Sequence, residues 1–366
     1  MRKLLAIALA AVLVVSAMAF KVIMVTDTGG LGDRSFNDGT WSGIVRAAKE
    51  LGADYEVIQS YEQADYIPNL SKAAEQADLV FAVGFMMTDA LFKVAEQYPD
   101  TKFVGIDIVP PEGKDLPNVM TFTFKEQEAA FLVGYVAAAM TKTGIVGFIG
   151  GIPIPPVERF RYGFEAGVRT YEAVHGVKIK ILRGYTNEFS DPKKGKDLAM
   201  SQFAEGADVI FHASGACGNG VIEAAREKFA ELVGKENPTL QDFIDYYFEH
   251  GKAYFAIGVD ADQDYMAPGA VLASAMKRVD MAAYYAVKWA YEGTFEGGHV
   301  VLGLAEDGVG ISPMKYTKGM VPNKVIAELA LITNSIKKGA LKVPDTQEAL
   351  NSFTVPKWLS FPWVKK

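Results

Sequence analysis

The sequence predicts an α/β protein made of two doubly wound, Rossmann-like lobes that are joined by a hinge. The chain has 366 residues, which is more than one hydrophobic core usually holds. Short apolar runs rich in β-branched residues also alternate with longer segments of helical periodicity, twice over. This alternation is typical of parallel sheets covered by helices.

The first lobe is expected over residues 20–125. Its first strand, 21–26, runs into a glycine-rich turn, and a helix follows at 41–51, where apolar residues recur every three or four positions. Further strands are expected at 55–59, 79–84, 103–108 and 119–124, and helices at 67–77 and 89–98.

The second lobe is expected over residues 126–252 and begins with a long helix at 126–141. Its strands are expected at 145–149, 178–183 and 209–213, and its helices at 157–174, 191–204 and 219–228. The segment 229–252 is charged and aromatic and interrupts the alternation, which predicts an inserted helical hairpin.

After residue 252 the sequence predicts strands at 253–259 and 271–275 and helices at 279–291 and 323–338. We expect the segment near 253–280 to return to the first lobe and the segment near 281–366 to return to the second. Several short crossovers would then form the hinge. The aromatic stretch 353–363 is expected to pack across a lobe.

Residues 1–19 have the pattern of a signal peptide. Arg2 and Lys3 precede an apolar run at 4–15, and Ala17-Met18-Ala19 offers a cleavage site. The run is shorter than the roughly 20 apolar residues that span a bilayer, although an uncleaved anchor is the alternative. The single cysteine, Cys217, lies far from this segment, so no cysteine is available there for lipidation. We therefore expect a secreted, periplasmic or cell-envelope protein that is soluble after cleavage.

Composition argues against several classes of protein. The net charge of −7 argues against the basic surface that binding of nucleic acid requires. One cysteine excludes an intramolecular disulfide, and the four dispersed histidines suggest neither a metal site nor a cofactor. The sequence has no hydrolase nucleophile elbow, phosphate-binding loop or zinc-protease motif, so we expect no enzyme. Hydrolysis by a carboxylate pair stays open at this point.

Polar turns follow the expected strands, where doubly wound sheets bind ligands. The turn 27–38 combines glycines, acids, amides and an aromatic ring, and its acids would repel phosphate. It could also be an ordinary capped loop. Its candidate ligand-binding residues, with one from the next helix, are Asp27, Ser35, Phe36, Asn37, Asp38 and Trp41.

Later strand ends supply the other candidate ligand-binding residues: Phe85, Asp107, Ser214, Gly215, Asp260 and Lys277. Asp107 precedes a proline-containing loop, which disfavours a helix-capping role. Asp260 could hold sugar hydroxyls because a carboxylate accepts two hydrogen bonds. Lys277 could donate to the same sugar, pair with Asp260, or be a plain surface lysine. Phe85 suits the core equally well.

Several motifs follow one another in a familiar order. They are Asp27-x-Gly29…Ser35-Phe36-Asn37, Gly84-Phe85, Gly147-Phe148-Ile149-Gly150-Gly151, Arg161-x-Gly163-Phe164-x-x-Gly167, Ser214-Gly215-x-x-Gly218-x-Gly220, Gly258-Val259-Asp260-x-Asp262-Gln263 and Ser274-x-x-Lys277-Arg278-Val279-Asp280. From about Lys21 to about Pro313 the chain resembles the basic membrane protein family of ABC-transporter substrate-binding proteins. The purine nucleoside receptor is the best-understood type of that family.

The resemblance implies a type I periplasmic-binding-protein fold with the solute held between two hinged lobes. It implies that Phe36 stacks on the base, with a second aromatic ring from the other lobe near His212 and Ser214. Asp27, Asn37 and Asp107 would fix the base edge. Asp260 and Lys277 would hold the ribose.

The expected function is therefore an extracytoplasmic binding protein of an ABC importer that captures a purine nucleoside. Its partners would be this solute and the transmembrane permease subunits; we expect a monomer with no cofactor and no nucleic acid partner. Alternatives are another ring-containing solute such as riboflavin, a secreted nucleoside hydrolase, a nucleotide-dependent oxidoreductase, or a sensor of the same fold. Many members of the family are lipoproteins, whereas a lipidation cysteine is missing from this N-terminal segment.

Overall fold

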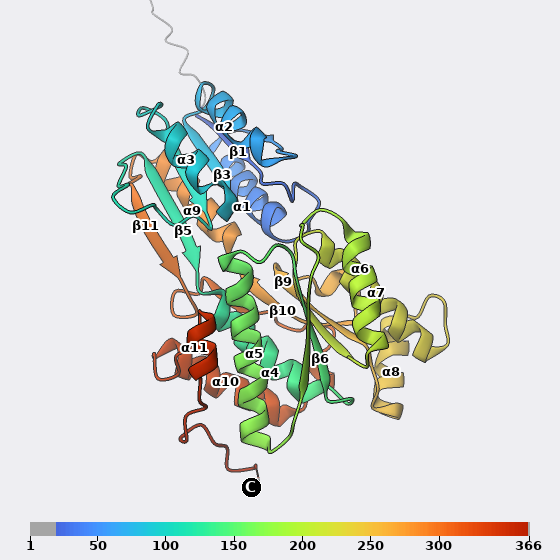
Figure 1. Cartoon of the computed structure of the whole chain (residues 1–366). Coiled ribbons are helices and arrows are strands. Elements are labelled where there is room, and N and C mark those ends of the chain that lie inside the picture. The colour runs from blue at the N-terminus through green and yellow to red at the C-terminus, as the bar shows by residue number, and fades with distance from the viewer. Residues whose placement is uncertain (1–19, 365–366) are drawn as a thin grey trace, which may run out of the picture.

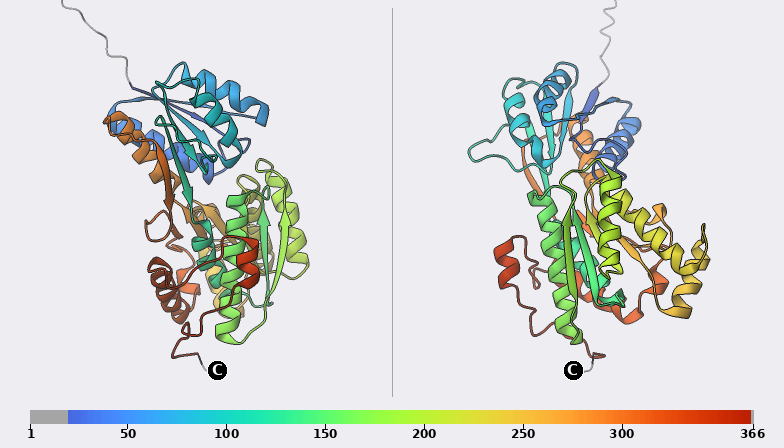
Figure 2. Two further views of the ribbon diagram at one scale, coloured as in Figure 1. Left: turned by 60° about the vertical axis from the view of Figure 1, so that its left-hand side comes forward. Right: turned by 45° about the vertical axis from the view of Figure 1, so that its right-hand side comes forward.

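The computed structural model describes residues 20–364, so the expected signal peptide at 1–19 lies outside the described residues. The chain forms two α/β lobes stacked end to end (Figure 1). Within residues 20–364 each lobe has one six-stranded sheet. Helices cover both faces of each sheet, as the two turned views show (Figure 2). This is the predicted fold class.

The sheet of lobe 1 is parallel throughout, with strand order β11-β5-β4-β3-β1-β2. The central strand β3 is buried along its whole length because helices cover it on both sides, and its sequence LVFAV is accordingly apolar throughout. The strands of lobe 1 are β1 (Lys21–Val25), β2 (Asp54–Ile58), β3 (Leu79–Val83), β4 (Lys102–Ile106), β5 (Val119–Phe124) and β11 (Gly298–Leu302). Its helices are α1 (Phe36–Leu51), α2 (Tyr66–Ala74), α3 (Thr88–Ala95) and α9 (Val279–Tyr291).

The sheet of lobe 2 has the order β12-β10-β9-β8-β6-β7, and β12 runs antiparallel to β10. Its strands are β6 (Ile145–Gly150), β7 (Lys180–Tyr185), β8 (Val209–Ala213), β9 (Phe255–Asp260), β10 (Val271–Lys277) and β12 (Val309–Ile311). Its helices are α4 (Glu126–Met140), α5 (Pro155–His175), α6 (Pro192–Ala204), α7 (Cys217–Val233), α8 (Leu240–His250), α10 (Asn323–Lys337) and α11 (Gln347–Ser352).

The point at which the chain returns to lobe 1 differs from the sequence prediction. The segment 253–280 was expected in lobe 1, but β9 pairs with β8 and β10 pairs with β9, so both strands belong to lobe 2. The chain returns only with α9, which packs beside α1, and with β11, which pairs with β5 (Figure 2). It re-enters lobe 2 at β12. The prediction was wrong because fully buried apolar strands look the same whichever sheet they join.

The segment 229–252 forms the outer part of a helix pair. α7 continues to Val233, and α8 folds back against it. The ring centroids of Phe243 and Phe229 lie 4.4 Å apart, and the buried ring of Tyr247 lies 6.1 Å from that of Phe255 in β9. The pair is therefore anchored to the core of lobe 2, away from the waist between the lobes (Figure 1).

Glycines in the motif at 161–167 allow α5 to pack tightly on α4. A Cβ atom added at Gly163 would lie 2.1 Å from the carbonyl oxygen of Gln127, and one at Gly167 would lie 2.1 Å from that of Phe131. Such distances leave no room for any side chain, so glycine is required at both positions. This motif supports the scaffold of lobe 2.

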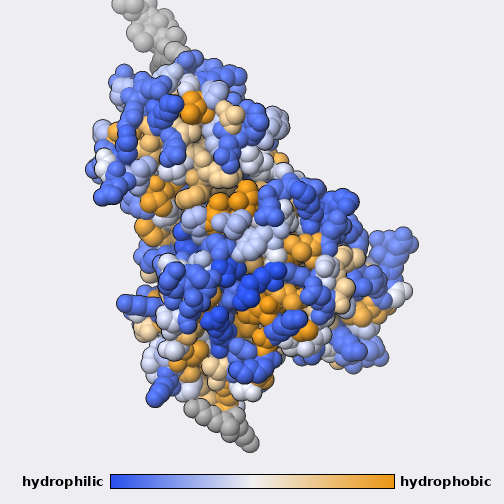
Figure 3. Space-filling view, viewed as in Figure 1, coloured by the Kyte–Doolittle hydropathy of each residue, from blue (hydrophilic) through white to orange (hydrophobic). Residues whose placement is uncertain are grey.

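Most of the visible face is hydrophilic, and apolar side chains gather at the waist and over parts of lobe 2 (Figure 3). None of the helices within residues 20–364 combines the length and the apolar character that crossing a membrane requires.

Candidate functional site

The carboxyl ends of strands from both sheets meet at the waist and enclose a cavity of about 540 Å³, part of it open to solvent. Nine predicted residues line it: Asp27, Phe36, Asn37, Phe85 and Asp107 from lobe 1, and Ser214, Gly215, Asp260 and Lys277 from lobe 2. Polar turns that are far apart in the sequence thus meet in one place.

Lys277, the last residue of β10, is the buried cation of this cavity. Its Nζ donates to Oδ2 of Asp107 at 2.6 Å and lies 3.7 Å from Oδ1 of Asp260. Burial alone would lower the pKa of Lys277, but the charges of Asp107, Asp260 and Glu126 outweigh it and hold that pKa above its usual value. Lys277 therefore stays charged, and it links the two lobes. Because it is buried, it is not a plain surface lysine.

The two acids beside Lys277 occupy matching positions in the two lobes. Asp107 directly follows β4 and Asp260 ends β9, and both have left-handed backbones, with φ of 62° and 61°. Aspartate tolerates this conformation better than most residues, and such strain is frequent at binding sites. Oδ1 of each side chain is buried without a hydrogen-bond partner within the described residues. Each acid therefore keeps an acceptor for a ligand.

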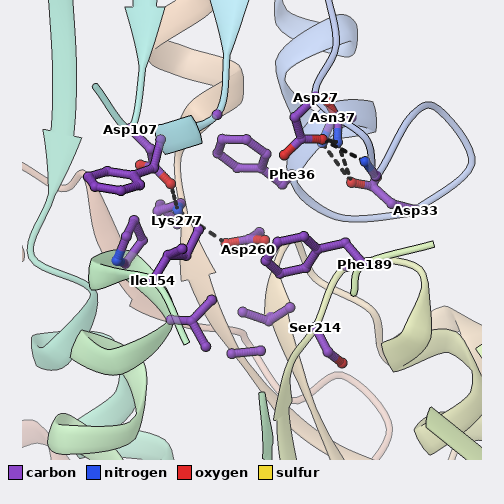
Figure 4. A pocket seen from close by; sticks show the side chains of 18 of the residues that line it. Asp27, Asp33, Phe36, Asn37, Asp107, Ile154, Phe189, Ser214, Asp260 and Lys277 are labelled. Atoms are coloured by element: carbon purple, nitrogen blue, oxygen red, sulfur yellow. Dashed lines mark hydrogen bonds and ion pairs between the residues drawn. The ribbon is translucent and has the colours of Figure 1, made fainter. Parts of the chain in front are cut away.

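Asp27 and Asn37 form a second polar group at the lobe 1 end of the cavity (Figure 4). Nδ2 of Asn37 donates to Oδ1 of Asp27 at 3.0 Å and to Oδ2 of Asp33 at 3.2 Å. Burial raises the pKa of Asp27 to about 6, although the bond from Asn37 partly offsets this. Asp107 lies with Lys277, on the other side of Phe36 from this group (Figure 4).

Two aromatic rings face the cavity from opposite lobes. Phe36 begins α1, and Phe189 lies in the loop between β7 and α6 (Figure 4). The sequence indicated a second ring near Ser214 without identifying it. Phe189 does lie there, because a Cβ added at Gly215 would contact its Cβ at 3.2 Å. Sequence reasoning also missed the apolar wall formed by Ile154, Pro156, Val157 and Phe160.

Three predicted residues lie off the cavity wall. The carboxylate of Asp38 accepts hydrogen bonds from the backbone amides of Gly32 and Arg34, so it holds the turn together. Trp41 packs against Tyr55, with ring centroids 5.7 Å apart. Ser35 lines a neighbouring hollow that it shares with Asp260 and Lys277.

Hydrogen bonds also join the lobes at the rim of the cavity. Nε2 of Gln263 donates to the carbonyl oxygen of Arg34 at 3.2 Å, and Nδ2 of Asn219 donates to that of Gly32 at 3.3 Å. Oε1 of Gln263 faces Nε2 of His212, whose pKa burial lowers to about 4. The imidazole is therefore neutral and positions Gln263, which agrees with a structural role for this histidine.

Comparison with known proteins places this architecture in a family. Residues 20–347 match the Bmp family, described as PnrA-like ABC transporter substrate-binding proteins. The chain belongs to this family. The match covers both lobes and every residue of the cavity wall. The PnrA-like chain thus has the family relationship and the fold that its ordered motifs predicted.

The names of several relatives of this PnrA-like protein agree with the family match. An uncharacterized lipoprotein of Pyrococcus horikoshii is 36% identical over 297 residues, which cover 80% of this chain and 68% of that protein. Basic membrane protein A1 of Borrelia garinii is 32% identical, over 91% of this chain and 90% of that one. A crystal structure of solute-binding proteins of an ABC transporter system from Aeropyrum pernix superimposes with a TM-score of 0.80 at 30% identity, over 91% and 96% of the two chains.

Proposed function

We propose that this ABC-transporter substrate-binding protein captures a purine nucleoside in the cavity between its lobes. The observation that carries the proposal is one cavity with an aromatic ring from each lobe and polar groups at two separate ends. A planar base suits the rings, because stacking is favourable for any π-face. A ribose suits the end at Asp260 and Lys277, where acceptors and a donor lie side by side.

The charge of the cavity favours a nucleoside over a nucleotide. Four carboxyl groups line the wall, those of Asp27, Asp33, Asp107 and Asp260, against the single ammonium of Lys277. A phosphate dianion would meet like charges in a buried place, and no second cation among the described lining residues would compensate it. A neutral solute rich in hydrogen-bond donors meets no such penalty.

The proposed mechanism is capture by closure. The solute would contact both lobes at once, so it would stabilise the closed arrangement in which Gln263 and Asn219 reach lobe 1. The permease subunits of an ABC importer would then bind the closed form outside the cytoplasm. We propose no chemical step, and the nucleoside would leave the site unchanged.

Calorimetry on ligand-stripped protein tests the proposal. The titrants are inosine, guanosine and adenosine, with cytidine, riboflavin and inosine 5′-monophosphate as comparisons. We expect tight binding of purine nucleosides and at least about tenfold weaker binding of the monophosphate, because burying an uncompensated charge is costly. Preferential binding of riboflavin would replace the purine assignment. Release of free base from inosine during incubation would identify a hydrolase.

A further inference from the structure

The ammonium of Lys277 has a further carboxylate neighbour outside the cavity wall. Oε1 of Glu126 lies 3.5 Å from Nζ of Lys277, and the side chain of Glu126 is fully buried. Glu126 is the first residue of α4 and is not one of the described residues that line the cavity. Any effect of this carboxylate on a bound ligand must therefore pass through Lys277.

Arg159 of α5 fixes the orientation of this carboxylate. Its Nε donates to Oε2 of Glu126 at 2.6 Å, and its Nη2 donates to Oε1 at 3.3 Å. A contact at two points between a guanidinium and a carboxylate sets the angle of the carboxylate as well as its distance. Oε1 of Glu126 is therefore held at a defined place beside Lys277.

Aromatic rings surround the same ammonium. Nζ of Lys277 lies 4.7 Å from the ring centroid of Phe36 and 5.6 Å from those of Phe124 and Phe160. Ring faces attract a cation but are weaker partners than ionised oxygens, and a buried ammonium has three donors to satisfy. The position of Nζ between these rings is therefore determined by the carboxylates around it.

The carboxylates around Lys277 are divided between the lobes. Lys277, Glu126 and Asp260 belong to lobe 2, and Asp107 belongs to lobe 1. In the opening that the proposed mechanism requires, Lys277 would lose Asp107 and keep the other two. The chain passes from β5 to α4 at Glu126 and from β10 to α9 just after Lys277. This ion pair therefore lies where the two lobes are joined.

We propose, on the basis of the purine nucleoside function above, that Glu126 is a positioning residue. Held by Arg159, it keeps the ammonium of Lys277 at the ribose end of the cavity while the lobes are open. The ribose then meets a donor that is already in place, which lowers the entropic cost of binding. Without the charge of Glu126, the acids left to act on Lys277 are Asp107 and Asp260. Lys277 would then pair more closely with the acceptors that the ribose requires.

Glu126→Gln tests this role because it removes the charge and keeps the shape of the side chain. The readout is the ratio of the affinities for inosine and for 2′,3′-dideoxyinosine, which lacks both hydroxyls of the ribose ring. We expect this ratio to fall by at least about fivefold in Glu126→Gln, because the hydroxyls lose part of their contribution. Calorimetry on the variant and the unaltered protein measures it.

An unchanged ratio in Glu126→Gln would overturn the positioning role and leave the proposed function intact. If the unaltered protein does not bind inosine, the proposed function fails, and this inference fails with it.

Glu165→Gln is the matched control. Glu165 is a glutamate of α5 with 1% exposure that accepts hydrogen bonds from Arg161 and Arg183, and it is not among the described residues that line the cavity. Loss of a buried contact between glutamate and arginine should lower the melting temperature of both variants. The affinity ratio should change in Glu126→Gln alone. An equal fall in both would indicate a general loss of structure and contradict the inference.

Arg159→Lys provides a second test, which holds even if Glu126→Gln does not fold. Lysine keeps the positive charge but cannot donate two parallel hydrogen bonds, so Glu126 is held less firmly. We expect the affinity ratio to fall by at least about twofold. In a Lys277→Met background the same change should leave the ratio unaltered, because the ammonium through which it acts is gone. An unchanged ratio in Arg159→Lys alone, or an equal fall in both backgrounds, would contradict the proposal.

Discussion

Nζ of Lys277 lies 2.6 Å from Oδ2 of Asp107 and so connects the end of β10 in lobe 2 with the end of β4 in lobe 1. Both side chains are almost fully buried, at 3% and 6% exposure. Asp260 and Glu126 lie within 4 Å of the same ammonium. Lys277 therefore compensates several buried negative charges at the point where the lobes meet.

Replacing Lys277 by Met should destabilise the ligand-free protein. The methionine fills a similar volume but leaves the surrounding carboxylates without their cation, and breaking a buried pair in this way costs about 3–5 kcal/mol. Urea unfolding at pH 8 would measure the loss. Lys288→Met is the control, because Lys288 is 41% exposed and 3.8 Å from Glu292, so its removal should change little. A loss below about 1 kcal/mol for Lys277→Met would show that this cation is not needed.

The affinity for a donor-rich nucleoside should rise from pH 5 to pH 8. Burial raises the pKa of Asp27 to about 6 and that of Asp260 to about 7, and only the ionised forms are pure acceptors. The groups that act electrostatically or by hydrogen bonds on Asp27 are Asn37, Asp33, Asp107 and Tyr66, and those that act on Asp260 are Lys277, Asp107, Asp33 and Glu126. Calorimetry across this range would measure the change, and Asp260→Asn should flatten its upper part.

The same two acids should make the ligand-free protein less stable as the pH rises. Their folded-state pKa values exceed the ordinary value of 3.8, so the folded protein binds these protons more strongly than the unfolded chain does. The stabilisation is complete below about pH 4 and is lost as the pH rises through 6 to 7. Thermal unfolding of ligand-free protein at pH 5 and pH 8 checks the sign. Asp27→Asn together with Asp260→Asn should reduce the difference.

Phe36 and Phe189 should contribute comparably to binding. Replacing either ring by Ala should weaken nucleoside affinity by about 1–3 kcal/mol, the range measured for stacked bases. Phe248→Ala is the control, because Phe248 lies on α8 and is 64% exposed. If Phe189→Ala binds as tightly as the unaltered protein, the second stacking ring has been assigned to the wrong residue.

The contact between Asn219 and Gly32 should favour the closed form. Asn219→Ala removes one hydrogen bond between the lobes, so we expect roughly two- to tenfold weaker nucleoside binding with no loss of melting temperature. Small-angle scattering should show a more open average shape at a subsaturating ligand concentration. Asn351→Ala on α11 serves as the control, because within the described residues the side chain of Asn351 hydrogen-bonds only to Gln347.

Much of the fold could be predicted from the sequence because buried parallel strands leave a strong apolar signal. The strand predicted at 119–124 matches β5, and the helix predicted at 279–291 matches α9. The lobe to which β9 and β10 belong could not be predicted, since both strands are buried on both faces, with only Met276 partly exposed. Short β11 and β12 were missed because β11 is half exposed and β12 has only three residues.

The cavity wall was predictable where acids and glycines follow a strand, as at Asp107, Asp260 and Gly215. Phe189 was missed because the loop between β7 and α6 has no glycine, although this loop follows a predicted strand of lobe 2. Trp41 has the periodicity of the apolar face of α1, and that periodicity does not distinguish a cavity from the contact with Tyr55. Sequence patterns therefore located the site more accurately than each of its side chains.

The crystal structure of the protein with bound inosine tests the central claim most directly. The base should lie between Phe36 and Phe189, with its polar edge at the Asp27 end of the cavity and the ribose hydroxyls at Asp260 and Lys277. Inosine bound outside this cavity, or with its ribose at Asp27, would contradict it.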